Sequence, residues 1–185
     1  MRPVYLAESE LALLLVIDMQ QRLMPHIADH ESVVDNAVRM IRAARLLSTP
    51  LLATEQNPRG LGETIRPVID ALPPDLPRHD KEMFSCWGDA AFRERLQAAR
   101  REHVIVVGIE AHVCVQQTVL DLLQVDYVPF VLADAVGSRR PRDRDLSLER
   151  MRQAGAIVTS TEAMIMELQR SYTAPTFKQI LKIVK

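Results

Sequence analysis

Cys114 is the side chain of this sequence best suited to nucleophilic chemistry. It lies in GIEAHVCVQQTVLDLL, directly after the apolar run of residues 104–107 and directly before a helical pattern. The first-turn N–H groups and the dipole of a helix stabilise a thiolate, so this position predicts a lowered thiol pKa. Ligands of open α/β sheets also gather outside the carboxyl ends of the strands. From position alone, Cys114 is either a nucleophile or a small packed side chain.

Asp18 and Lys81 are the charged residues that could activate such a thiol. Asp18 follows six apolar residues, so its carboxylate stands at the end of a buried strand and needs a partner. It could cap the next helix or act as a general base at the strand-end crevice. Lys81 lies in RHDKEMFSCWG. A lone lysine is usually solvated, but beside Asp18 and a cysteine it would lower the thiol pKa.

Other reactive side chains carry weaker signals. Cys86 lies beside Trp87 without a helix-start pattern, so we expect it to pack as a small apolar side chain. His112 is near Cys114 in the sequence, and we expect it to orient or line a pocket. A cluster of arginines could bind a substrate carboxylate, although a solvated face is the commoner role. The cluster consists of Arg139, Arg140, Arg142 and Arg144.

Metal-binding and phosphate-binding motifs are missing from the sequence. The two cysteines are far apart and His26, His30, His79 and His103 lack metal-ligand spacing, so there is no zinc signature. The chain has six glycines, with neither a GxGxxG pattern nor a Walker A loop. We therefore expect no cofactor.

The bulk composition predicts a single domain over residues 1–185. The chain is 48% hydrophobic and 25% charged, which is ordinary for a globular protein. A formal net charge of -1 gives no reason to expect nucleic acid or an anionic membrane as a partner. No signal peptide and no membrane-spanning run are visible. We expect a cytoplasmic protein with reduced thiols and a small-molecule substrate.

Apolar runs and amphipathic segments alternate along the chain. Strands are expected at residues 12–17, 51–54, 104–108, 127–132 and 157–159, although Pro129 weakens the fourth as a central strand. Helices are expected at residues 33–47, 89–101, 113–124, 143–154 and from 161 onward. An apolar stripe at 177–184 is expected to dock on its own domain or on a neighbour. Residues 55–87 read as a long loop with short turns. This alternation predicts a parallel sheet covered on both faces.

Three motifs in sequence order carry a resemblance to the isochorismatase-like cysteine hydrolases. They are LLLVIDMQ, HDKEMFSCWG and VIVVGIEAHVCVQQTVLDLL, and the resemblance covers residues 11–168. The segment TEQNPRGLGETI looks closest to the isochorismatase-domain-containing subgroup. The resemblance implies a doubly wound, three-layer α/β/α fold with a six-stranded, mainly parallel sheet. It also implies a catalytic triad of Asp18, Lys81 and Cys114.

The resemblance further implies a non-proline cis peptide bond between Ile109 and Glu110. Asp18 would take the thiol proton, Lys81 would stabilise the thiolate, and the N–H groups of Glu110 and Cys114 would form an oxyanion hole. The charge of Glu110 would face the pocket and disfavour an anionic group. The substrate would be a small amide, or a related C–N or ester bond. The remaining pocket residues are expected to be Gln20, Glu55, Trp87 and His112.

Relatives with metal-dependent chemistry carry histidines in the loop after the second strand. That loop reads EQNPRGLGETI in this chain and has none, so we expect no catalytic metal. Relatives commonly form dimers or larger rings, which implies a homo-oligomer.

Two other functions compete with hydrolysis. In a thiol-based redox protein, Cys114 would be oxidised and Cys86 is the internal candidate to resolve it. A noncatalytic oligomeric scaffold of the same fold is the third possibility. The joint presence of Asp18, Lys81 and Cys114 speaks against that scaffold.

Overall fold

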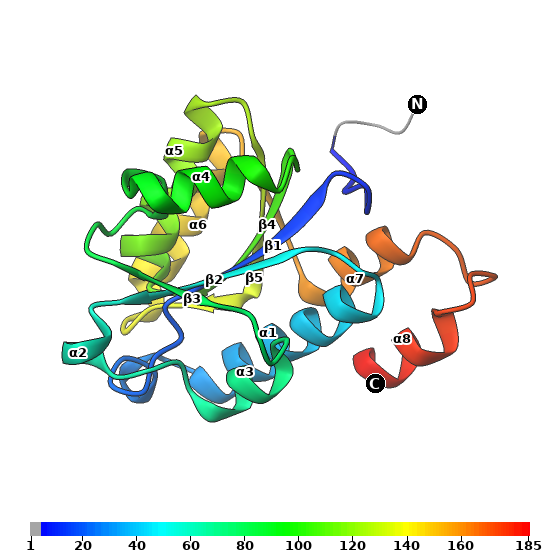
Figure 1. Ribbon diagram of the computed structural model, residues 1–185, viewed down its shortest axis with the longest axis horizontal. Coiled ribbons are helices and arrows are strands. Elements are labelled where there is room, and N and C mark those ends of the chain that lie inside the picture. Colours follow the sequence, from blue (N-terminus) through cyan, green and yellow to red (C-terminus); the bar gives the residue numbers. More distant parts are fainter. Residues whose placement is uncertain (1–4) are drawn as a thin grey trace.

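The computed structural model describes residues 5–185, and its centre is a six-stranded sheet in the order β3-β2-β1-β4-β5-β6 (Figure 1). Every neighbouring pair of strands is parallel. The expected doubly wound α/β fold is therefore confirmed. The strands are β1 (Ala12–Ile17), β2 (Leu51–Gln56), β3 (Arg78–Lys81), β4 (His103–Ile109), β5 (Val128–Gly137) and β6 (Ile157–Thr159).

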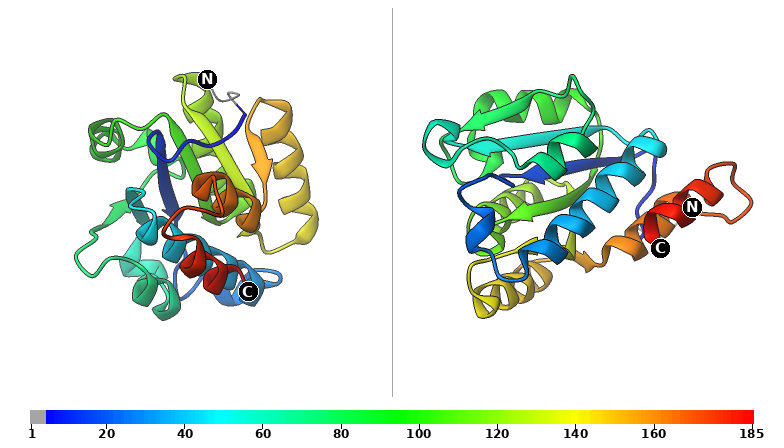
Figure 2. Two further views of the ribbon diagram at one scale, coloured as in Figure 1. Left: turned by 90° about the vertical axis from the view of Figure 1, so that its right-hand side faces the viewer. Right: turned by 90° about the horizontal axis from the view of Figure 1, so that it is seen from below.

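Helices cover both faces of this sheet. One layer contains α1 (His30–Leu46), α3 (Arg66–Ala71), α7 (Thr161–Gln169) and α8 (Phe177–Val184). The opposite layer contains α4 (Ala90–Ala98), α5 (Gln116–Gln124) and α6 (Pro141–Gln153). The apolar C-terminal stripe forms α8, which packs on α1 and α7 of its own chain (Figure 2). Shorter segments are α2 (Pro58–Leu61), the 3-10 turns Met24–His26 and Cys86–Gly88, and the π turn Ala111–Val115.

The central strand β1 shows why the sheet is covered on both sides. All six of its residues are buried. Leu14 and Val16 face the cluster under α1, whereas Leu13, Leu15 and Ile17 face the cluster under α4 and α5. Successive side chains of a strand point to opposite faces, so a fully apolar strand requires a core on each side. Within residues 5–185, no helix is both long and apolar enough to span a membrane.

The structure corrects two expectations about the strands. The long loop of residues 55–87 contains α2, α3 and β3, so Lys81 ends an edge strand and does not lie in a loop. Pro129 does lie in an inner strand, because β5 is between β4 and β6. The proline is tolerated since β6 pairs with β5 only from Phe130 onward. The missing N–H of Pro129 therefore falls before the second ladder begins.

The strand order places a topological switch between β1 and β4. From β1 the chain builds outward through β2 and β3, and from β4 it builds the other way through β5 and β6. Helices on the two halves diverge there, and a crevice forms outside the carboxyl ends of the two strands. Asp18 follows β1 directly, and the turn that contains Cys114 follows β4. The fold thus brings both residues to one crevice.

Gly108 is needed for the close packing of these two central strands. It has φ 124°, and a Cβ built there would lie 2.1 Å from the carbonyl oxygen of Ile17. Gly155 also has a positive φ, 111°, but its nearest neighbour to such a Cβ is the Leu123 side chain at 3.9 Å. Both glycines have a positive φ, a conformation that other residues rarely adopt. Only Gly108 also lacks the space for a Cβ.

We predict that Gly108→Ala lowers the free energy of unfolding by at least about 3 kcal/mol, through strain and overpacking together. Gly155→Ala, the matched control, should cost only about 1–2 kcal/mol because it adds backbone strain alone. Urea denaturation of both variants measures the difference. Equal losses of unfolding free energy in the two variants would show that the close approach of β1 and β4 does not require glycine at position 108.

Candidate active site

A buried ion pair lies at the carboxyl edge of the sheet. Nζ of Lys81 is 2.7 Å from Oδ2 of Asp18, and both side chains are 0% exposed. Thr54, at the end of β2, donates its hydroxyl to Oδ1 of Asp18 at 2.7 Å. Asp18 is therefore not a helix cap, because α1 is preceded by Asp29 and the Asp18 carboxylate is bound to Lys81 and Thr54.

Lys81 has three further partners. Its ammonium donates to Oε1 of Gln56 at 2.7 Å and to the carbonyl oxygens of Met83 and Phe84 at 3.2 Å each. Burial lowers the pKa of Lys81, but Asp18, Cys86 and Cys114 together outweigh it and raise that pKa above its ordinary value. Lys81 is thus held as a cation in the interior, and the solvated alternative is excluded.

Cys114 lies against this pair in the turn Ala111–Val115, with 7% of its surface exposed. Burial and the charge of Asp18 raise the pKa of its thiol, while Lys81 acts in the opposite direction. The expectation of a lowered thiol pKa was wrong. Helix α5 begins at Gln116, after Cys114, and the buried thiol interacts with the negative charge of the Asp18 carboxylate. The resting nucleophile is a neutral thiol next to a base.

Oδ2 of Asp18 has a lone pair available to accept a proton. Oδ2 is buried, and among the described residues it has no well-aligned hydrogen bond although Lys81 is within 2.7 Å. An unsatisfied lone pair on a buried carboxylate is costly unless something donates to it. The Cys114 thiol, whose pKa is raised by the charge of Asp18, is a neighbouring group that could donate to it.

Cys86 packs in the interior as expected, yet it belongs to the same group of side chains. It is fully buried, and its sulfur lies 4.0 Å from the hydroxyl of Thr54. Burial, followed by the charge of Asp18, raises the pKa of Cys86 to about 12. A thiol with that pKa stays protonated at neutral pH and is a poor nucleophile.

Thr118 connects the turn of Cys114 to the loop that follows β3. Its hydroxyl donates to the carbonyl oxygen of Cys114 at 2.7 Å and accepts the N–H of Cys86 at 2.9 Å. Ser85 in the same loop donates to Asp121 of α5 at 2.5 Å. Sequence reasoning missed Thr54 and Thr118. Their signal was weak, because a threonine at a strand end or in a helix has many ordinary uses.

The bond between Ile109 and Glu110 is a cis peptide bond, at the position that the family resemblance implies. The carbonyl oxygen of Glu110 accepts the N–H groups of Val113 at 3.0 Å and Val115 at 3.2 Å. Glu110 and Cys114, whose N–H groups are the candidate oxyanion donors, therefore belong to one hydrogen-bonded turn. The structure brings that turn to the same edge as Asp18 and Lys81.

The other expected pocket residues are more dispersed. The Gln20 amide donates to the carbonyl oxygens of Gln56 and Gly62, and the Glu55 carboxylate accepts from Thr64 and Arg78. Both side chains thus hold the loop after β2 in place. Trp87 packs edge-on against Tyr127 and lines a separate cavity with it. His112 lies 2.9 Å from the Ser138 hydroxyl through Nδ1, beside the turn of Cys114.

A cavity of about 380 Å³ reaches Glu110, the residue before the turn that carries the nucleophile. Its charged residues are Glu110 and Arg139, and Oε2 of Glu110 accepts the backbone N–H of Arg139 at 3.1 Å and its Nε–H at 3.0 Å. The charge of Glu110 faces this cavity but is paired, which the sequence did not reveal. The lining residues are Leu23, His26, Ile27, Glu110 and Arg139.

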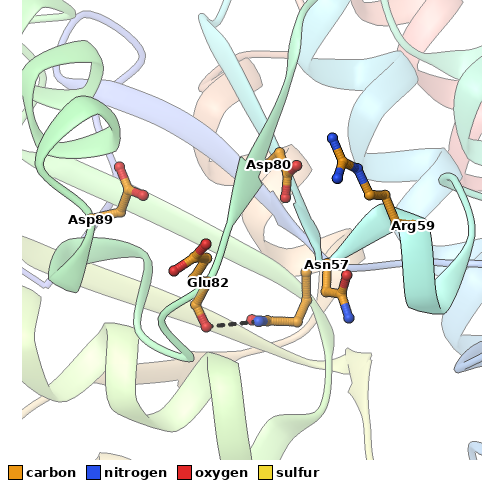
Figure 3. Close-up of a pocket in the computed structure, with 6 residues that line it drawn as sticks. Asn57, Arg59, Asp80, Glu82 and Asp89 are labelled. Carbon is orange, nitrogen blue, oxygen red and sulfur yellow. Dashed lines mark hydrogen bonds between the residues drawn. The ribbon is translucent and has the colours of Figure 1, made fainter.

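A larger cavity of about 700 Å³ lies at the β2–β3 edge and is rich in carboxylates (Figure 3). Gln56 connects it to the site, because its amide donates to the carbonyl oxygen of Glu82 and its oxygen accepts from Lys81. Among residues 5–185, no three His, Cys, Asp or Glu side chains are grouped as metal ligands. Asp18, Lys81 and Cys114 line neither of these two cavities, and the smaller one is connected to the site through Glu110, the residue before the turn of Cys114. The larger cavity is lined by Gln56, Asn57, Arg59, Asp80, Glu82 and Asp89.

Comparisons with known proteins show similarity in sequence and in fold. The isochorismatase domain model matches residues 12–163. Isochorismatase domain-containing protein 2A of Mus musculus is 38% identical over 184 residues, covering 95% of this chain and 84% of that protein. The MAR1 ribonuclease from Caenorhabditis elegans is 38% identical with a TM-score of 0.91, covering 96% of this chain and 91% of that one. The Escherichia coli YcaC gene product, an octameric hydrolase of unknown specificity, has a TM-score of 0.87 at 20% identity, covering 98% and 97%.

We predict that Asp18→Asn accelerates alkylation of Cys114 by iodoacetamide at neutral pH, because the charge that raises the thiol pKa is removed. Lys81→Met should slow the alkylation below the wild-type rate, because the cation that opposes Asp18 is lost. Mass spectrometry of the modified peptide gives both rates, with circular dichroism as the check on folding. A slower reaction in Asp18→Asn than in wild type would contradict the electrostatic effect of Asp18 on the thiol pKa.

We also predict that Thr118→Val costs about 1–3 kcal/mol of unfolding free energy, since it removes the hydroxyl that accepts the buried N–H of Cys86. Thr118→Ser keeps the hydroxyl and should be the more stable variant, although it loses a methyl group. Urea denaturation compares the two. The bridging role fails if the valine variant is as stable as the serine variant.

Proposed function

Because the chain belongs to the isochorismatase family, whose members include hydrolases, we propose that it is a cysteine hydrolase of a small amide, or of a related C–N or ester bond. The observation that carries the proposal is the buried Asp18–Lys81 pair in contact with the Cys114 thiol. A neutral thiol is a weak nucleophile, and an adjacent base is the usual means of activating it. The pair has no other evident use that would offset the cost of burying two charges.

In the first half of the proposed reaction, Asp18 removes the proton from Cys114 as the sulfur attacks the carbonyl carbon of the amide. Lys81 stabilises the anionic charge that moves from the carboxylate to the sulfur. The oxygen of the tetrahedral intermediate accepts from the N–H groups of Glu110 and Cys114, a type of contact worth about 3–4 kcal/mol per donor. The C–N bond then breaks, the amine leaves with the proton held by Asp18, and a thioester remains on Cys114.

In the second half, water attacks the thioester and gives a proton to Asp18. The C–S bond breaks, the carboxylic acid leaves, and the proton on Asp18 returns to the sulfur. The net reaction is amide plus water to acid plus amine. Both halves use the same carboxylate as base and then as acid, which suits a group held between a cation and a thiol.

The thiol redox alternative is weakened by the structure. Redox-sensing cysteines are typically exposed and have a low pKa, whereas burial raises the pKa of both Cys114 and Cys86.

A ribonuclease activity is suggested by the name of the 38% identical C. elegans protein. A net charge of -1 gives the chain no overall attraction for a polyanionic substrate. A noncatalytic scaffold leaves the buried charges unexplained.

The proposal also covers where the protein is located, how it assembles and whether it uses a metal. Cys86 and Cys114 are both free thiols, which suits the cytoplasm. The E. coli protein of the same fold is an octamer, and we propose that this chain is also a homo-oligomer. The mechanism uses Asp18, Lys81 and Cys114 and needs no metal, so chelators should leave turnover unchanged.

We predict that the protein releases ammonia or an amine from members of a panel of small primary and N-substituted amides. Cys114→Ala should lower turnover at least about 1,000-fold, or about 4 kcal/mol, because the covalent route is lost. Cys86→Ala, which removes the neighbouring buried thiol, is the matched control and should retain activity within about tenfold, or 1.4 kcal/mol.

Full turnover by Cys114→Ala would overturn the covalent mechanism. The same samples are assayed with hydrogen peroxide and with single-stranded RNA. Peroxide-dependent loss of thiols without any hydrolysis would favour the redox function. Cleavage of RNA that persists in Cys114→Ala would indicate a nuclease.

A further inference from the structure

We propose that Glu110 and Arg139 together select the distal end of the substrate, and that this end is a neutral group with both an N–H donor and a C=O acceptor, such as a second carboxamide or a urea. The inference rests on the proposed amide hydrolysis. It concerns which amide is used, because the two residues flank the nucleophile turn and do not enter the bond-breaking steps through their side chains.

Glu110 and Arg139 both lie near the turn that carries the nucleophile. Glu110 precedes the turn Ala111–Val115 that carries Cys114, and Arg139 follows β5, the neighbouring strand. Both residues line the cavity of about 380 Å³, which is large enough for part of a small molecule. Cys114 does not line this cavity, so we place the reacting carbonyl at the turn beyond Glu110 and only the distal end of the substrate in the cavity.

The hydrogen bonds of the pair leave one acceptor and several donors available. Oε2 of Glu110 receives the backbone N–H and the Nε–H of Arg139. Among the described residues, no partner is recorded for Oε1 of Glu110 or for the terminal Nη groups of Arg139. The backbone contact fixes the Glu110 carboxylate, whose side chain is 11% exposed, while that of Arg139 is 63% exposed. Oε1 of Glu110, a fixed acceptor, therefore lies beside the Nη donors of Arg139.

The charges decide which ligand fits this arrangement. A carboxylate placed against the Arg139 guanidinium would also meet the negative charge of Glu110, and an ammonium against Glu110 would meet Arg139. The paired charges give no net preference for an ion. A carboxamide or a urea satisfies both residues at once, donating N–H to Glu110 and accepting from Arg139. An apolar end would leave both unpaired when water is displaced, and such losses are the strongest source of discrimination.

Leu23 and Ile27 form the apolar part of the same cavity, and His26 is its third polar residue. The apolar wall suits a short aliphatic spacer between the two polar ends. The predicted substrate class is thus a short-chain diamide or an amide with a ureido end. This class excludes simple fatty amides and amino acid amides with a free ammonium at the distal end.

The test compares four primary amides of similar length whose distal ends are a carboxamide, a carboxylate, a methyl group and an ammonium. Ammonia release gives kcat/KM for each. After correction for its two equivalent ends, the diamide should exceed each of the others by at least about tenfold, or 1.4 kcal/mol. Glu110→Gln should move the preference toward the carboxylate, and Arg139→Gln should move it toward the ammonium.

Arg140→Gln is the matched control, because Arg140 is an exposed neighbour outside the cavity lining. It should keep the wild-type order of substrates. An unchanged order in Glu110→Gln and Arg139→Gln would overturn the selection by this pair, as would a wild-type preference for the methyl or carboxylate end.

Failure of the inference can be separated from failure of the hydrolase itself. If amides are hydrolysed in a Cys114-dependent manner with no preference among distal ends, only the inference fails. If no amide is hydrolysed, binding of the four compounds to Cys114→Ala is measured by ligand-observed NMR. Tighter binding of the diamide, lost in Arg139→Gln, would support the site without the activity. Equal binding of all four would overturn it.

Discussion

Burying a carboxylate and an ammonium together costs several kcal/mol for each ion unless their remaining hydrogen bonds are also met. Lys81 meets this condition, and Asp18 meets it at Oδ1, through groups on β2 and in the loop after β3. In the sheet register, Ile17 lies opposite Thr54 and Gln56 lies opposite Lys81. The hydroxyl and the amide that surround the two charges therefore arrive at the same edge as the charges themselves. The site depends on this register, and a shift of β2 or β3 would leave buried ions without partners.

The same pair controls the nucleophile. Burial and the negative charge of Asp18 keep the Cys114 thiol protonated, whereas the positive charge of Lys81 favours its ionisation. Proton transfer from sulfur to carboxylate therefore moves a negative charge between two positions that both face Lys81. The cation compensates the charge before and after transfer, so little reorganisation is needed at the moment of reaction. A permanently ionised thiolate would also react with oxidants, and burial protects the neutral thiol from them.

The sequence predicted the elements with strong periodicity or long apolar runs and failed where local signals conflicted. Ala12–Ile17 was predicted at its observed bounds because six consecutive apolar residues end at a charge. Strand β3 was missed because its four residues, RHDK, are all polar or charged, and only the sheet position makes them a strand. The raised pKa of Cys114 could not be foreseen, since it depends on how deeply the turn is buried beside Asp18. The Glu110–Arg139 contact joins residues 29 positions apart and left no pattern in the sequence.

The central claim is that hydrolysis passes through an acyl group on Cys114. It is tested most directly by partitioning between water and hydroxylamine, using an amide and an ester of the same acid. A shared thioester intermediate predicts that both substrates give the same ratio of hydroxamate to free acid, because the leaving group has departed before the nucleophiles compete. A ratio that differs between the amide and the ester, or acid formation without any hydroxamate, would contradict the account.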